Sequence, residues 1–228
     1  MKTDPAPSDD FTPRDNFIYL AAALTFFVLS ISAVQAVIPN VHGPVLEIIT
    51  LIALLIAVRS MRRSLQVFRV GLALTAIVLA IVGMGFFVDT PALALLHGLT
   101  LVAFFTLTIF TALRQVVLAG DVDTNCVVGA ITIYVMIAID FSVLYTFLEA
   151  ISPGAFKGLG GGSTRAAFID LMYFSFVTLG TVGYGDILPV HPVARILAMM
   201  EMVVGQFYIA ILVATLVGAR KTRWGRAD

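Results

Sequence analysis

Charged residues and cysteines are scarce in this chain, and each scarcity excludes a class of protein. Only 12 % of the 228 residues are charged, whereas an ordinary soluble domain has about 25 %. The single cysteine, Cys126, excludes an internal disulfide and any metal site built from several cysteines. The first 16 residues lack the basic start and the cleavage site of a signal peptide. We therefore expect a polytopic membrane protein whose first apolar segment stays in the bilayer as an anchor.

Residue types that carry out catalysis are also few. The histidines are His42, His97 and His191, and they lie apart, near the ends of apolar segments. The chain has no Ser/His pair at a plausible spacing, no cluster of metal ligands and no phosphate-binding loop. We expect a protein that is not an enzyme, needs no cofactor and has no nucleic-acid partner.

Hydrophobic residues, by contrast, make up 60 % of the chain, and the mean hydropathy is +1.01. Segments of about 20 apolar residues cross a bilayer as helices, because a helix satisfies its backbone polar groups internally. The segment 165–178 is apolar but too short to span, and it lies in the long connection 149–190. We predict an all-α membrane protein with six transmembrane helices and a re-entrant helix. The predicted spans are 17–38, 41–58 (a short one that carries Glu47), 70–88, 92–113, 126–148 and 191–218.

Lysines and arginines predict how the chain sits in the membrane, because they gather in cytoplasmic loops. With both termini in the cytoplasm, 11 of the 14 lie inside. We expect a multi-pass protein of the cell membrane with the connection 149–190 on the outer side. The basic segments 59–69 and 220–226 follow from this topology alone, and binding of anionic lipid headgroups is the alternative explanation. The basic residues expected outside are Lys157, Arg165 and Arg195.

A glycine-containing motif, Thr181-Val182-Gly183-Tyr184-Gly185, follows the short apolar segment. A dehydrated cation needs oxygen ligands in place of its water, and potassium channels supply rings of backbone carbonyls from four chains. The carbonyls of one loop point to one axis only where some residues adopt conformations that glycine tolerates best. With average residue usage, this pentapeptide arises by chance in about one chain in ten thousand of this length. The motif therefore predicts a potassium selectivity filter, in which Val182 and Tyr184 point away from the axis and pack around the loop.

The stretch from Tyr173 to Asp186 resembles the pore helix and filter of the potassium channel family, and in particular its bacterial six-helix members without large cytosolic domains. The likeness covers 126–220, the two-helix pore unit. It implies a homotetramer with the filter on the fourfold axis, the sixth helix lining an inner cavity, and K⁺ as the permeant ion. Departures from the family pattern are Gly180, where many relatives have threonine, and Tyr173 and Phe174, where many have tryptophan. Carried over by position, the implied filter residues are Thr181 (carbonyl and hydroxyl), Val182, Gly183, Tyr184 and Gly185.

Polar residues near the motif are predicted to support it. Thr178 precedes the motif and Asp186 follows it, and an exposed loop acid is the alternative for Asp186. Asp140 and Glu201 lie in predicted spans, where an ionisable group is costly and should face protein or water. For Glu201 we predict a hydrogen bond to the pore helix from behind, at Ser175 or Thr178. A pH-sensitive gate element is the alternative.

Gly205 lies one helical turn after Glu201 in the last predicted span. It is predicted either as a hinge, since glycine lowers the cost of bending a helix, or as a point of close helix packing. If the helix bends there, Gln206, Ile209 and Val213 share one helical face and line the inner cavity.

The fourth predicted span, 92–113, contains no lysine or arginine. A voltage sensor moves charge through the membrane field, about 2.3 kcal/mol per charge per 100 mV, and uses an arginine-rich helix for this. His97 is expected to pack between helices, and Arg114 lies at the inner end. We therefore expect a potassium channel subunit with weak or no intrinsic voltage dependence. The predicted domains are a cytoplasmic tail (1–16), a four-helix domain similar to a voltage sensor (17–118), a pore domain (119–219) and a basic cytoplasmic tail (220–228).

Other functions compete with this one. A non-selective cation channel uses the same architecture, although Tyr184 argues against it. The ion-translocating subunit of a potassium uptake transporter also carries filter-like glycine loops, usually as several degenerate copies in one long chain. This chain has one copy with its tyrosine intact, so the mass of the assembled complex distinguishes a tetrameric channel from a transporter subunit.

Overall fold

The computed structural model describes residues 16–37, 44–60, 65–85, 90–117, 124–161 and 164–224. These ranges are mostly helical, in agreement with the predicted all-α class. Helices form at all the predicted spans because these apolar segments satisfy their backbone polar groups internally. The helices are α1 Asn16–Val37, α2 Pro44–Ser60, α3 Leu65–Gly85, α4 Pro91–Val117, α5 Thr124–Ile151, α6 Thr164–Leu179 and α7 Pro192–Trp224, and the strands are β1 Phe156–Lys157 and β2 Leu188–Pro189.

Among the described residues, four helices are long and apolar enough to cross a membrane: α3, α4, α5 and α7. A crossing by α1 and α2, which would bring the total to six, stays a prediction. The tail predicted before the first span lies outside the described residues up to position 15.

α7 extends beyond its predicted end. The sequence predicted a span that ends at 218 and a basic tail over 220–228, but the helix continues to Trp224. Lysine and arginine are strong helix formers, so the basic sequence at this end is compatible with a longer helix. Residues 225–228 lie outside the described part of the chain.

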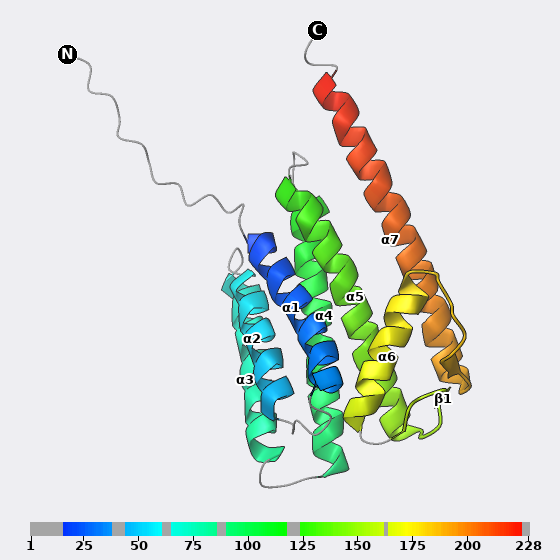
Figure 1. Ribbon diagram of the computed structural model, residues 1–228. Coiled ribbons are helices and arrows are strands. Elements are labelled where there is room, and N and C mark those ends of the chain that lie inside the picture. The colour runs from blue at the N-terminus through cyan, green and yellow to red at the C-terminus, as the bar shows by residue number, and fades with distance from the viewer. Residues whose placement is uncertain are drawn as a thin grey trace, which may run out of the picture.

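The first four helices form a bundle with α5 (Figure 1). α1 packs against α2 and α5, and α4 packs against α3 and α5. Lipid tails are as apolar as leucine, so helices in a bilayer are held together by this close packing more than by removal of apolar surface from water. Fully buried side chains of this core include Leu20 and Leu24 of α1, Leu54 of α2, Phe104 of α4 and Ile133 of α5.

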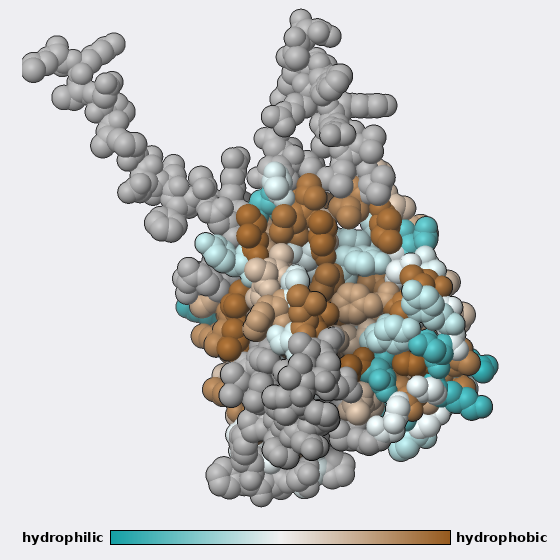
Figure 2. Space-filling model, in the orientation of Figure 1, coloured by the Kyte–Doolittle hydropathy of each residue, from teal (hydrophilic) through white to brown (hydrophobic). Residues whose placement is uncertain are grey.

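α6 and the segments that follow it lie beside the C-terminal half of α5 (Figure 1). Figure 1 shows α6 running from the end of the molecule that holds β1 to about the middle of α7, after which the chain returns to the same end. There β1 pairs antiparallel with β2, with Phe156 opposite Pro189. The start of α1 and the end of α7 lie at the opposite end of the molecule (Figure 1). In Figure 2, hydrophilic residues gather over the end with β1, and hydrophobic residues dominate farther up the same face.

Candidate functional site

The loop with the predicted filter begins at the end of α6, and α6 is fixed by its contacts with α5 and β1. Leu171 and Met172 of α6 are buried. Phe174 forms an edge-on aromatic cluster with Tyr145 of α5 and Phe156 of β1, with ring centroids 5.3 to 5.5 Å apart. Each such ring pair adds about 0.5–1.5 kcal/mol to the effect of burial. The loop therefore starts from a well-packed helix.

Backbone conformation alternates along the predicted filter. Thr181, Gly183 and Gly185 have positive φ angles of 57°, 60° and 81°, and the residues between them do not. A carbonyl-lined ion path requires successive carbonyl groups on the same side of the loop, and an alternation of this kind is compatible with that arrangement. Glycine adopts positive φ at little steric cost, but a β-branched residue such as Thr181 rarely does. Backbone outliers of this kind cluster at functional sites.

The amide groups of the loop face α6. The Thr181 amide donates to the Thr178 carbonyl at 3.0 Å, and the amides of Val182 and Gly183 both donate to the Val177 carbonyl, at 2.9 and 3.4 Å. These three bonds fix the first part of the loop against the end of the helix. Within the described part of the chain, no hydrogen bond reaches the carbonyl oxygens that the sequence predicts as ion ligands, those of Thr181, Val182, Gly183 and Tyr184.

Gly180 and Tyr173, two residues that depart from the family pattern, both lie in close contacts near the predicted filter. A Cβ at Gly180 would lie 3.0 Å from the Phe176 carbonyl oxygen, so a larger residue there requires a small shift of the turn. Tyr173 stacks on Tyr184, with ring centroids 6.4 Å apart and ring planes 3° apart. Tyr184 is nevertheless 71 % exposed and Val182 is 55 % exposed. Most of the packing predicted around these two side chains is therefore absent from the single described chain.

Asp186 is held from several directions just beyond the predicted filter. The Tyr173 hydroxyl donates a hydrogen bond to its carboxylate, which holds the pKa of Asp186 below its usual range. The Ile187 amide donates to Oδ1 of Asp186 at 3.1 Å. Gly158, with φ of 89°, lies so close that a Cβ there would come within 2.0 Å of the Asp186 carbonyl oxygen. Only glycine fits this contact, so the segment after β1 braces the chain next to the filter.

Glu201 of α7 is fully buried behind α6. Its carboxyl group accepts a hydrogen bond from the Tyr145 hydroxyl at 2.6 Å and is also hydrogen-bonded to the hydroxyl of Ser175 of α6, one of the two partners that the sequence suggested. Sequence reasoning missed Tyr145. A buried carboxyl group needs hydrogen-bond donors, but Tyr145 lies 56 positions away on another helix, and no spacing rule joins the two.

Gly205 lies where α7 crosses the end of α6. A Cβ at Gly205 would lie 2.4 Å from the Leu179 carbonyl oxygen, and α7 is one continuous helix through this point. The structure therefore has the close packing considered for Gly205, and a hinge remains a proposal. Gln206 and Ile209 are exposed in the single chain. The side chain of Val213 lies outside the described residues.

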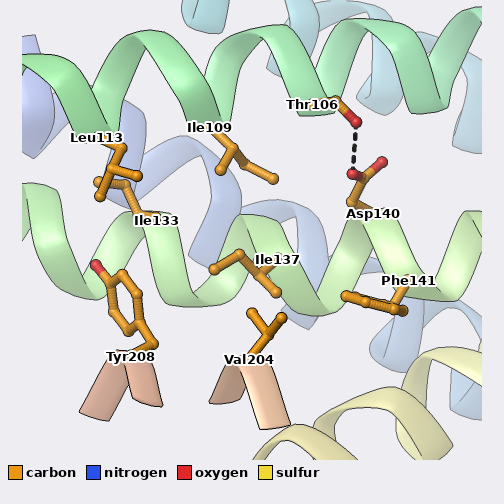
Figure 3. Close-up of a pocket in the computed structure, with 9 residues that line it drawn as sticks. All are labelled: Thr106, Ile109, Leu113, Ile133, Ile137, Asp140, Phe141, Val204 and Tyr208. Atoms are coloured by element: carbon orange, nitrogen blue, oxygen red, sulfur yellow. Dashed lines mark hydrogen bonds between the residues drawn. The ribbon is translucent and has the colours of Figure 1, made fainter. Parts of the chain in front are cut away.

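Asp140 of α5 lies beside a mostly apolar pocket of about 290 Å³ between α4, α5 and α7 (Figure 3). The Thr106 hydroxyl of α4 donates to its Oδ2 at 2.9 Å. Its Oδ1 is buried without a hydrogen-bond partner among the described residues. Asp140 thus faces protein, as predicted for an ionisable group in a span, and its bond to Thr106 ties α4 to α5.

Comparison with known proteins covers this part of the chain. A family profile described as "Ion channel" matches residues 131–219, from α5 to α7. The chain is 31 % identical over 83 residues to potassium channel protein kcv of Paramecium bursaria Chlorella virus 1, which covers 35 % of this chain and 84 % of that protein. It is 39 % identical over 83 residues to inward rectifier potassium channel Kirbac3.1 of Paramagnetospirillum magnetotacticum, with 35 % of this chain and 28 % of that protein covered.

A plant protein is also similar to part of the chain. Two pore potassium channel c of Oryza sativa subsp. japonica is 38 % identical over 72 residues, which covers 32 % of this chain and 15 % of that protein. This chain therefore spans less than a third of the length of the rice and Paramagnetospirillum channels, but the match includes most of the viral one. The chain is a multi-pass membrane protein that belongs to the potassium channel family of ion channels.

Proposed function

We propose that this chain is one subunit of a homotetrameric channel that conducts K⁺ passively and selectively. The observation that carries the proposal is the φ alternation along 181–185, with the loop amides bound to α6 and the carbonyls left free. Four such loops around one axis supply the carbonyl rings that replace the water shell of the ion. Thr181 adds its hydroxyl at the inner end. K⁺ is the permeant ion and not a cofactor, and each site must release it again for conduction.

Exposed apolar surface supports the assembly of several chains. Only 11 % of the α7 span 192–212 is buried within the single chain, and its Phe207 is 64 % exposed. Val182 and Tyr184 beside the filter are also exposed. In a tetramer, neighbouring chains cover these side chains, one face of α7 lines the inner cavity, and Gln206 and Ile209 belong to that face. We also propose Gly205 as the point where α7 bends on opening.

The direction of α6 favours a cation in the inner cavity. A helix carries about half a negative elementary charge at its C-terminal end, and α6 ends at Leu179, beside the middle of α7. In a tetramer, four such ends face the axis below the filter and stabilise a dehydrating cation there.

The described part of α4 supports weak or absent intrinsic voltage dependence. Its basic residue is Arg114 in the last turn, where the guanidinium lies 4.3 Å from the centre of the Phe110 ring. A charge at the end of a helix crosses little of the membrane field, so movement of α4 supplies little of the energy that a voltage-gated channel needs.

The proposed orientation puts both termini in the cytoplasm and β1 outside. The excess of lysine and arginine on the proposed inner side supports it, and the basic segments there also suit anionic lipid headgroups. Antibody access to an epitope tag at either terminus, in intact and permeabilised cells, tests this orientation.

A pair of glycine variants tests the proposed filter. Gly183 and Gly154 both have positive φ, of 60° and 83°, and a Cβ would meet no atom within 4 Å at either position. Alanine therefore imposes similar backbone strain at both sites, but only Gly183 lies in the filter. In vesicles with purified protein, Gly183→Ala should abolish K⁺ selectivity and Gly154→Ala should retain it. Equal K⁺ and Na⁺ fluxes in wild type indicate a non-selective channel, and a monomeric complex mass indicates a transporter subunit.

A further inference from the structure

A group of buried polar residues joins α5, α6 and α7, and α6 leads into the proposed filter. Tyr145 of α5, Ser175 of α6 and Glu201 of α7 are all fully buried. Tyr145 and Ser175 both contact the Glu201 carboxyl group, one at each oxygen. The Ser175 hydroxyl also lies 2.7 Å from the Ala138 carbonyl oxygen of α5. We call Tyr145, Ser175, Glu201 and the Ala138 carbonyl the Glu201 cluster.

The number of protons available for hydrogen bonds in the Glu201 cluster indicates whether the Glu201 carboxyl group is protonated or ionised. A serine hydroxyl has one proton to donate, but Ser175 has two oxygen neighbours at hydrogen-bond range, the Ala138 carbonyl and Oε1 of Glu201. If Glu201 is ionised, both neighbours are acceptors only, and one of the two short oxygen contacts has no proton. If Glu201 carries a proton on Oε1, that proton goes to Ser175 and the serine proton goes to Ala138. Tyr145 then donates to Oε2, and every contact contains one proton.

The surroundings of the cluster agree with a neutral carboxyl group. The titratable side chains that face Glu201 are Tyr145 and, farther along α5, Tyr134. α6 contributes only the uncharged Ser175, and no lysine, arginine or histidine of the described segments forms an ion pair with Glu201. A buried carboxylate without a cationic partner is strongly unfavourable and takes up a proton instead.

We infer that Glu201 works as a protonated carboxylic acid, whose proton positions the pore helix by donating to Ser175. The resulting chain of bonds runs from α7 through α6 to α5 and fixes α6 between its two neighbours. It lies one helical turn before Gly205, where α7 meets the Leu179 carbonyl. The carbonyl of Val177, two positions after Ser175, in turn holds the filter amides. If Glu201 loses this proton, the Ser175 hydroxyl must donate its own proton to Glu201 in place of the Ala138 carbonyl. The hydrogen bond from Ser175 to Ala138, which ties α6 to α5, is then lost.

Infrared spectroscopy of the purified full chain in lipid vesicles tests the protonation state directly. A protonated carboxyl group has a C=O stretch that is separate from those of carboxylates and amides. We expect such a band at neutral pH, its absence in Glu201→Gln, and its persistence in Asp140→Asn, which controls for the other buried acid. A spectrum in which Glu201→Gln removes no protonated-carboxyl band overturns the inference.

Vesicle flux then tests the positioning role, which rests on the proposed function. Glutamine donates one amide proton to Ser175 and accepts from Tyr145, so Glu201→Gln should retain the wild-type K⁺/Na⁺ flux ratio. Glu201→Met leaves the Tyr145 hydroxyl unpaired and removes the bond to Ser175, and because an unsatisfied buried polar group is unfavourable, this variant should lower that ratio. Raising the pH until the infrared band disappears should lower wild-type K⁺ flux but leave Glu201→Gln unaffected. Equal losses in the glutamine and methionine variants overturn the inference.

A comparison of two buried serines, Ser175 and Ser142, distinguishes an effect of the Glu201 cluster from an effect of ordinary helix packing. The Ser142 hydroxyl also donates to the Ala138 carbonyl, at 2.6 Å, and is also fully buried, but it does not contact Glu201. Ser175→Ala should shift the infrared band of Glu201, and Ser142→Ala should leave it in place; equal shifts contradict the assignment. The infrared result does not depend on conduction, so a wild-type protein with the band but without K⁺ selectivity overturns the proposed function alone.

Discussion

Replacing Gly205 by alanine should disturb the filter even though alanine is the better helix former. A Cβ at this position would lie 2.4 Å from the Leu179 carbonyl oxygen and 2.9 Å from its Cδ1. Contacts below 3.0 Å are essentially never made by a real Cβ, so the carbonyl must move by about 0.6 Å or more. Leu179 ends α6, and Gly180 and Thr181 follow it directly. The shift therefore reaches the inner end of the filter.

Gly83 of α3 provides a matched control, because a Cβ there would meet no atom within 4 Å. Glycine to alanine inside a helix gains up to about 1 kcal/mol in helix propensity, and both variants share this gain. Overpacking against atoms that cannot easily move costs about 1–3 kcal/mol, and only Gly205→Ala has this cost. The free energies of unfolding of the two variants should therefore differ by about 1–3 kcal/mol.

The assay is denaturant unfolding of purified protein in detergent micelles, followed by circular dichroism, together with K⁺ and Na⁺ flux in vesicles. Gly83→Ala should be at least as stable as wild type, with the same flux ratio. Gly205→Ala should be less stable than Gly83→Ala and less selective than wild type. Equal stability and equal flux ratios in the two variants would refute the packing argument and leave Gly205 with the hinge role alone.

Two more substitutions test polar contacts made by Asp186 and Asp140. Tyr173→Phe removes the hydrogen bond that holds the pKa of Asp186 below its usual range. Since stabilisation from a lowered pKa is lost as the pH falls through the folded-state value, a pH titration should show acid inactivation of K⁺ flux beginning at a higher pH in this variant; an unchanged profile contradicts the contact. Thr106→Val leaves Asp140 without its described donor and should lower stability by about 1–3 kcal/mol. Thr100→Val removes only a bond to a carbonyl of its own helix, so equal unfolding midpoints for the two valine variants would argue against a role for the Thr106 bond.

The helices and part of the backbone conformation of the loop 181–185 could be predicted from sequence because their causes are local. Apolar length alone forces a helix in a bilayer, and α1 to α5 and α7 form where such segments lie. The spacing of Gly183 and Gly185 anticipates two of the positive φ angles. The third, at Thr181, could not be inferred from residue preference, because threonine disfavours this conformation and adopts it only where the surrounding contacts impose it.

Contacts between distant helices could not be predicted, since the sequence does not specify which helical faces meet. For Glu201 the sequence predicts either Ser175 or Thr178 as partner, because both hydroxyls lie on the short helix before the predicted filter. Tyr145 reaches the same carboxyl group from α5, and its position in that helix gives no sign of this. Gly205 had two equally suitable explanations until the position of the Leu179 carbonyl showed the close contact.

The environment of Val182 and Tyr184 depends on more than one chain. Their sequence positions predicted side chains that pack around the filter, yet both are exposed in the described chain. In the proposed tetramer the missing neighbours belong to adjacent subunits. The sequence of one chain does not show which residues of a neighbouring subunit it contacts. The packing of Val182 and Tyr184 could therefore be predicted, but the residues that they pack against could not.

The bi-ionic reversal potential of the purified protein in a planar bilayer tests the central claim most directly. With K⁺ on one side and Na⁺ on the other, selective carbonyl rings at 181–185 predict a reversal potential well away from zero, with the sign that K⁺ permeation sets. A wild-type reversal potential near zero would contradict a potassium-selective filter in this loop.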